Sequence, residues 1–121
     1  MSEKKALIPK EEALLIELPF CDLHWHCHAD NTDAENLSLG TAVFPPGGAH
    51  GPHRHPNAEE FIYVLKGQSI QTLEDQTFEM RPGDCVHIPQ NAVHSTRNVG
   101  DGELAILVGF SAASPEVVDV E

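Results

Sequence analysis

A pair of histidines and a pair of glutamates stand close together near the middle of the chain. His53 and His55 are two residues apart, so in an extended backbone both imidazoles face the same side. Glu59 and Glu60 follow after a short turn signal, at the start of an apolar segment. Imidazole nitrogens bind Zn, Cu, Fe and Ni, and an added carboxylate favours harder ions such as Mn or Fe(II). The combination indicates a metal site, whereas either pair taken alone is more typical of a solvated surface.

A further residue of ligand type, His94, lies in a later segment, and the two segments together resemble the two motifs of the cupin superfamily. The first motif, G-x5-H-x-H-x(3,4)-E-x6-G, is matched by Gly47, His53, His55, Glu60 and Gly67. The second motif, G-x5-P-x-G-x2-H-x3-N, is matched by Gly83, Pro89, His94 and Asn98. The gap before Gly67 selects Glu60 rather than Glu59. Asn91 stands where the family has glycine, but asparagine tolerates the left-handed backbone, so we expect the turn to be kept.

The resemblance covers roughly residues 37–110 and implies a double-stranded β-helix, or jelly-roll barrel, with a metal inside one end. Matched residue by residue, it implies that the ligands of one divalent ion per chain are His53, His55, Glu60 and His94. The candidate ions are Mn, Fe, Ni and Zn. With these four ligands, a six-coordinate ion keeps up to two positions open for water, substrate or dioxygen. The resemblance assigns no further catalytic residue.

The elements that must position these residues are short strands. Segments with strand character alternate with Gly, Pro, Asn and Asp turn signals, and no window carries a 3.6-residue apolar stripe. We expect strands near 14–18, 23–28, 37–44, 60–66, 68–73, 76–80, 84–88, 93–98 and 103–110. This pattern predicts an all-β sandwich or barrel, and only the resemblance favours the jelly roll. Residues 1–13 are expected to form a flexible leader, and residues 14–121 a single domain.

The composition excludes several classes of partner. Seven Lys and Arg against 19 Asp and Glu give a net charge of −12, which argues against nucleic acid and against an anionic membrane. No apolar run reaches the roughly 20 residues that span a bilayer, and no signal peptide is evident. Three cysteines without a C-x-x-C pair argue against a disulfide framework. We therefore expect a cytoplasmic protein with reduced thiols.

Three of the eight histidines alternate along one expected strand. His24, His26 and His28 share one face of that strand, and Trp25 and Cys27 share the other. The histidines face outward, or into a dimer contact, if Trp25 packs in the core. Otherwise they line the barrel as substrate contacts. We favour the outward orientation, because the face that carries Trp25 is the more apolar one.

Two further histidines, two cysteines and one arginine are expected to have roles other than binding the metal. His50 is expected in a solvated loop near the barrel mouth, and His87 is either a structural histidine or a neighbour of the metal ligands. Cys21 and Cys85 are expected to be structural, with Cys85 a small core residue. Arg54 lies between two ligand positions, so by strand parity its side chain points away from them. No Arg or Lys cluster suits a phosphorylated substrate.

Two function classes remain open from the sequence. The first is a metal-dependent enzyme that acts on a small oxygenated molecule, as an oxygenase or as a redox-neutral isomerase or lyase. The second is a non-catalytic metal-bearing cupin that binds or senses a small ligand. The complete ligand set favours the enzyme. We also expect a homodimer, because the aliphatic residues of 14–18 and 115–120 lie outside both motifs and could pair with a second copy.

Overall fold

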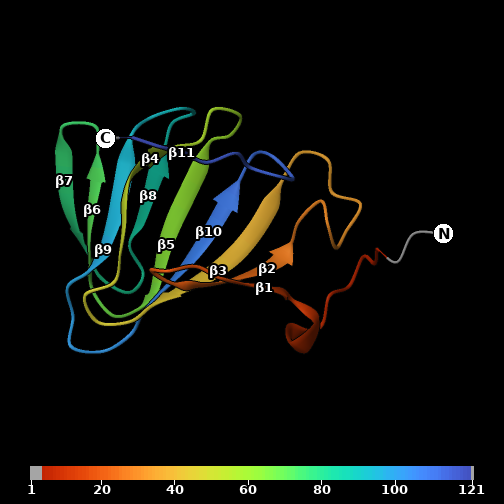
Figure 1. The fold of residues 1–121 in the computed structure, drawn as a ribbon, viewed down its shortest axis with the longest axis horizontal. Helices are drawn as coiled ribbons and strands as arrows, with labels where there is room; N and C mark the ends of the chain where they lie inside the picture. Colours follow the sequence, from red (N-terminus) through yellow and green to blue (C-terminus); the bar gives the residue numbers. More distant parts are fainter. Residues whose placement is uncertain (1–3, 121) are drawn as a thin grey trace.

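The computed structural model describes residues 4–120, which form two antiparallel β-sheets packed face to face (Figure 1). The larger sheet contains, in spatial order, β1 (Leu14–Glu17), β2 (Asp22–Cys27), β3 (Ser38–Phe44), β10 (Leu104–Phe110), β5 (Glu60–Lys66) and β8 (Cys85–Ile88). The smaller sheet contains β11 (Val118–Asp119), β4 (Ala49–Arg54), β9 (His94–Asn98), β6 (Ser69–Leu73) and β7 (Gln76–Met80). The all-β prediction is confirmed, and every strand expected from the sequence is present with ends shifted by no more than one residue.

The core lies between the two sheets and follows the two-residue period of the strands. In β3 every second residue is buried, and the strand pairs with β10 over its full length, from Leu104 opposite Phe44 to Phe110 opposite Ser38. Val64 of β5 is fully buried in the same layer. Burial of such a side chain stabilises the fold by about 1.5–3 kcal/mol. These central strands therefore form the packed core layer that positions Glu60, the first residue of β5.

Two strands were not expected from the sequence, and both belong to the sheet that carries the histidine pair. β4 includes Gly51 and Pro52, residue types that are uncommon within strands, so the sequence did not predict it. The register of β4 against β9 shifts between His50 and His53. β11 pairs with β4, with Val118 opposite Arg54. The expectation of a solvated loop at His50 is therefore wrong, because a bulged strand occupies that segment.

The motif glycines and asparagines have structural causes. Gly67 has φ +88°, and a Cβ there would lie 2.5 Å from the carbonyl oxygen of Glu103. Asn91 adopts φ 67°, so the predicted left-handed turn is kept with asparagine in place of glycine. The buried Asn98 amide donates to the carbonyls of Phe44 (3.1 Å), Pro45 (3.0 Å) and Gly102 (2.8 Å). It therefore ties the end of β3 to the turn before β10.

The expected leader and the two aliphatic segments have contacts within the chain. Lys10–Glu12 form a single 3₁₀ turn, and the backbone N–H of Lys5 donates to the carbonyl of Asn31 (3.3 Å). β1 pairs with β2, and β11 with β4, so both aliphatic segments find partners without a second copy. Flexibility of residues 1–13 and the homodimer stay predictions, and residues 1–3 lie outside the described residues. Within 4–120, no helix has the length and apolar character needed to cross a membrane.

Candidate metal centre

Both sheets contribute to one buried cluster of polar side chains at the end of the barrel. His53 in β4 stands opposite His94, the first residue of β9, and His55 lies just beyond the end of β4. Glu60 is the first residue of β5 in the other sheet. All four side chains are buried, with 1–5% of their surface exposed. The structure therefore brings together all four residues that the sequence selected.

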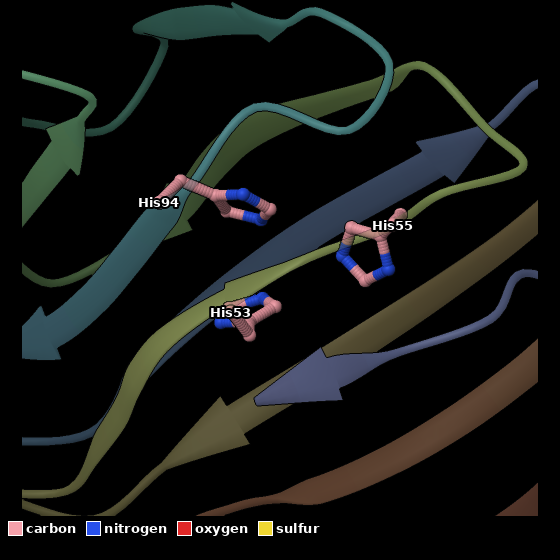
Figure 2. A group of neighbouring side chains, drawn as sticks. All are labelled: His53, His55 and His94. Atoms are coloured by element: carbon pink, nitrogen blue, oxygen red, sulfur yellow. The ribbon is translucent and has the colours of Figure 1, made fainter. Parts of the chain in front are cut away.

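The three imidazoles point toward one another (Figure 2). Each offers a ring nitrogen, and these nitrogens all lie within 4.8 Å of one another. Glu60 reaches the same point from the opposite sheet: its Oε1 lies 2.9 Å from Nε2 of His94 and 3.2 Å from Nε2 of His55. Three nitrogens and one carboxylate oxygen thus converge in a space of the size that one ion requires.

The backbone fixes the orientation of each imidazole through its Nδ1 atom. Nδ1 of His53 contacts the carbonyl of Gly51 (2.7 Å), and Nδ1 of His94 contacts the carbonyl of Ala92 (3.0 Å). Nδ1 of His55 contacts the carbonyl of Glu116 (2.8 Å). A carbonyl only accepts, so in each neutral ring Nδ1 must carry the proton. Each Nε2 therefore keeps a free lone pair, which is the usual state of a metal-binding histidine.

The converging atoms lack satisfied hydrogen bonds. Nε2 of His55, Nε2 of His94 and Oε1 of Glu60 are within contact distance, but among residues 4–120 none has a hydrogen bond of acceptable geometry. Buried polar atoms are almost always paired, so three orphaned atoms at one point call for a ligand. The residues present therefore fit a divalent metal ion, which binds neutral imidazole nitrogen and carboxylate oxygen together.

Burial and mutual contacts shift the pKa values of these groups. Burial, with the neighbouring His94 and His50, lowers the pKa of His53 from 6.5 to about 3. The pKa of Glu60 is lowered because its contacts with His55 and His94 outweigh the opposing effect of burial. The same contact with Glu60 overcomes the opposing burial and raises the pKa of His55. At neutral pH, His53 is therefore a neutral imidazole and Glu60 an ionised carboxylate.

His50 belongs to this site, which the sequence analysis did not foresee. Its ring stacks on that of His53, with centroids 3.5 Å apart and an interplanar angle of 6°. The other face of His50 lies against Phe20, with centroids 4.2 Å apart. Burial lowers the pKa of His50 to about 4. The available signal was the position of His50 within the first motif, but the bulge in β4 that turns it toward the site is not visible in the sequence.

The neighbours of the ligand positions point away from the cluster. Arg54 donates from Nη1 to Oδ1 of Asn91 (2.7 Å), as strand parity predicts. Glu59 contacts Nε2 of His87 on the outer surface at 2.8 Å, so the choice of Glu60 is consistent with the geometry. Cys85 shares the outer face of β8 with His87 and is exposed, so its expected core position is wrong. Val86 and Ile88 form the inward face of that strand instead.

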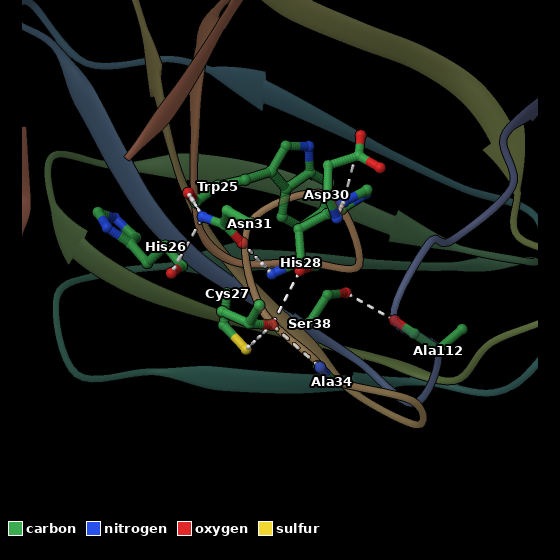
Figure 3. Close-up of polar contacts among 10 residues, drawn as sticks. Trp25, His26, Cys27, His28, Asp30, Asn31, Ala34, Ser38 and Ala112 are labelled. Carbon is green, nitrogen blue, oxygen red and sulfur yellow. Dashed lines mark hydrogen bonds and ion pairs between the residues drawn. The ribbon is translucent and has the colours of Figure 1, made fainter. Parts of the chain in front are cut away.

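The three alternating histidines near the N-terminus do not share one environment. His24 and His26 lie on the outer face of β2, where Nε2 of His26 contacts Oγ1 of Thr41 (2.6 Å), as the favoured interpretation predicts. His28 lies beyond the end of β2, is buried and packs on Trp25. Figure 3 shows the cause: Asn31 closes a turn by accepting from the backbone N–H of His28 (2.8 Å). The predicted common face therefore fails at His28, where a turn replaces the strand.

A cavity of about 120 Å³ adjoins the cluster in the space between the sheets. Its walls include His53, His55, Glu60 and His94 at one end and mainly apolar side chains elsewhere. A small molecule in this cavity would therefore lie directly against the candidate metal position.

Residues 40–110 match the family model for the cupin domain, and the chain belongs to the cupin family. An uncharacterized protein of Methanocaldococcus jannaschii is 37% identical over 103 residues, which is 85% of this chain and 76% of that protein. The dimethylsulfoniopropionate lyase DddW of Ruegeria pomeroyi is 34% identical over 100 residues. That match covers 81% of this chain but only 64% of the lyase.

Longer proteins contain the same domain. An oxalate oxidase of Triticum aestivum, GF-3.8, is 32% identical over 97 residues, and the chain spans 43% of its length. Solved structures of oxalate decarboxylase from Lactobacillus farciminis and Bacillus subtilis superpose with TM-scores of 0.82 and 0.81. Each is 23% identical and covers 91% of this chain, which spans 34% and 30% of theirs. These structures confirm the cupin fold of the two sheets.

Proposed function

We propose that this chain is a metal-dependent cupin enzyme that acts on a small oxygenated molecule. One observation carries the proposal: the carbonyl contacts at Nδ1 of His53, His55 and His94 leave three Nε2 lone pairs beside the buried Oε1 of Glu60. A purely structural cluster would pair these atoms. Here two of the nitrogens and the carboxylate oxygen are left without hydrogen bonds among residues 4–120.

The donor set favours one divalent first-row ion, with Mn²⁺ or Fe²⁺ the best match to three imidazoles and a carboxylate. Such an ion acts as a Lewis acid, lowers the pKa of bound water and orients a substrate. The chain supplies the rest: His50 presents an imidazole to the adjoining cavity, and the apolar walls exclude water.

The relatives support a catalytic role. Proteins that resemble this chain are named as a lyase of dimethylsulfoniopropionate and as oxidases of oxalate. One structural study of the similar Bacillus subtilis oxalate decarboxylase concerns its Mn(II) centres. These activities belong to those proteins, and the substrate of this chain is a separate question.

The test compares Glu60→Gln with Glu59→Gln, because the two glutamates are adjacent and only Glu60 faces the cluster. Wild type and Glu59→Gln should each bind about one Mn²⁺ or Fe²⁺ per chain by elemental analysis, and Glu60→Gln should bind far less. Both metal forms are then incubated with hydroxy-ketones, enols, uronates and phenols, while an oxygen electrode and product analysis follow turnover. Turnover that Glu60→Gln lacks supports the enzyme. Full metal content with ligand binding but no turnover would indicate the binding or sensing cupin instead.

A further inference from the structure

The walls of the cavity beside the cluster are apolar. They are formed mainly by aliphatic and aromatic side chains from β2, β3, β10 and β5 and from the residue after β1, chiefly Leu18, Leu23, Phe44, Ile62, Ile106 and Val108. Burial of a ligand's hydrocarbon groups against these walls is favourable. A polar ligand group buried there without a hydrogen-bond partner is unfavourable. The cavity therefore selects its ligand mainly by excluding molecules that carry several polar or charged groups.

Within residues 4–120, no Lys or Arg side chain lines this cavity. The chain has seven Lys and Arg residues, and none of them is among the lining residues. Arg54, which lies between two ligand positions, is directed outward to Asn91. A ligand carboxylate that does not reach the metal position would therefore be buried without a counter-charge, which is strongly unfavourable.

Outside the four clustered residues, two wall groups, the His50 imidazole and the Trp25 indole, make no hydrogen bond among residues 4–120. The hydroxyl of Thr96 donates to Oε1 of Gln71 (2.6 Å), so its proton is engaged. Cys21 is a neutral thiol, because burial raises its pKa to about 12. No hydrogen bond within residues 4–120 involves the His50 ring, although the ring is held between Phe20 and His53. The His50 ring stacks on His53, so a polar ligand group at the end of the cavity beside the four clustered residues meets His50.

We propose that the site takes a small ligand with an apolar body and a single polar head, neutral or singly negative, and that His50 hydrogen-bonds this head. The proposal rests on the proposed function. A divalent ion with ionised Glu60 carries one net positive charge, which a monoanion neutralises. A dianion would leave one negative charge among apolar walls.

The size of the cavity limits the ligand further. An apolar cavity of roughly 150 Å³ holds a molecule of about the size of benzene. At about 120 Å³, this partly open cavity suits a ligand whose buried part has a slightly smaller volume. Short branched monocarboxylates and small cyclic ketones meet both limits, whereas dicarboxylates and sugars do not.

The preference for a singly negative over a doubly negative ligand, here called the charge rule, is tested with isobutyrate and methylmalonate. The two share a carbon skeleton, and methylmalonate has a carboxylate in place of one methyl group of isobutyrate. Binding to the Zn-loaded protein is followed by amide chemical shifts in ¹⁵N NMR, with metal content checked afterwards. Isobutyrate should bind at least about tenfold more tightly than methylmalonate. Leu18→Arg, which adds a cation to the wall, should reverse this preference. Leu65→Arg makes the same change at an exposed position of β5 outside the cavity and should leave the preference intact.

The role of His50 is tested with His50→Phe, which keeps an aromatic ring between Phe20 and His53 but removes the hydrogen bond. This variant should bind cyclopentanone about tenfold more weakly, in metal-free and in Zn-loaded protein alike, with unchanged zinc content. The metal-free measurement separates the two hypotheses, because it does not require the proposed metal. Equal or tighter binding of methylmalonate to wild type would overturn the charge rule. Unchanged cyclopentanone binding in His50→Phe would overturn the role of His50.

Discussion

Acidification should lower the free energy of unfolding of the metal-free protein, because the fold keeps His53 neutral. Burial lowers the pKa of His53 from 6.5 to about 3, so at pH 5 the folded protein leaves this ring unprotonated while the unfolded chain protonates it. The unfolded state then binds more protons, so the free energy of unfolding decreases as the pH is lowered. The contribution of His53 is complete above pH 6.5 and is lost as the pH decreases toward 3.

The magnitude follows from the pH interval. Between pH 7 and pH 5 the folded ring stays neutral, so the loss is set by protonation of the unfolded chain and amounts to about 2 kcal/mol. His55 and Glu60 act differently: the raised pKa of His55 gives stability that is lost as pH rises, and the lowered pKa of Glu60 gives stability that is lost below pH 4.5. A comparison with His53→Asn, whose amide can still donate to Gly51, isolates the contribution of His53.

The assay is urea unfolding of wild type and His53→Asn in EDTA at pH 7 and pH 5. The difference in free energy of unfolding between the two proteins should change by about 2 kcal/mol in favour of the variant at the lower pH. Equal m values at both pH values would show that the comparison reports stability alone. A difference that stays constant between the two pH values would refute the assignment of a buried neutral imidazole.

Two further predictions concern the scaffold. Asn98→Ala should lower the free energy of unfolding by about 3 kcal/mol in urea titrations. The buried carbonyl of Phe44 and two partly buried carbonyls lose their donor, and the N–H of Gly100 loses its acceptor. A loss below about 1 kcal/mol would contradict this role. Light scattering should give a homodimer of twice 13.2 kDa, formed along the edge strand β1, where Leu15 and Ile16 are exposed; Ile16→Lys should then yield monomer, and a wild-type monomer at all concentrations would exclude the dimer.

Sequence reasoning found the four clustered residues because the spacing of a motif encodes them directly. The β-strand period put His53 and His55 on one side, and the gap to Gly67 chose Glu60 over its neighbour. The turn at Asn91 was predictable for the same reason, since one residue type with a known backbone preference decides it.

Features that depend on long-range pairing were not predictable. His50 reaches the site only because β4 bulges against β9. His28 leaves the face of its neighbours because β2 ends at Cys27 and Asn31 closes a turn directly after it. Strand parity correctly placed Cys85 on the same face of β8 as His87. Val86 and Ile88 pack in the core, so the face that carries Cys85 turns outward. The alternation of residues along a strand shows which side chains share a face. The packing of the two sheets determines which of the two faces is buried.

The most direct test of the metal centre is an anomalous difference map from a crystal of the Mn-loaded protein, measured at the manganese edge. One peak per chain is expected, within about 2.0–2.3 Å of Nε2 of His53, His55 and His94 and of a carboxylate oxygen of Glu60. A peak elsewhere, or no peak at a site with intact ligands and bulk manganese present, would contradict the account.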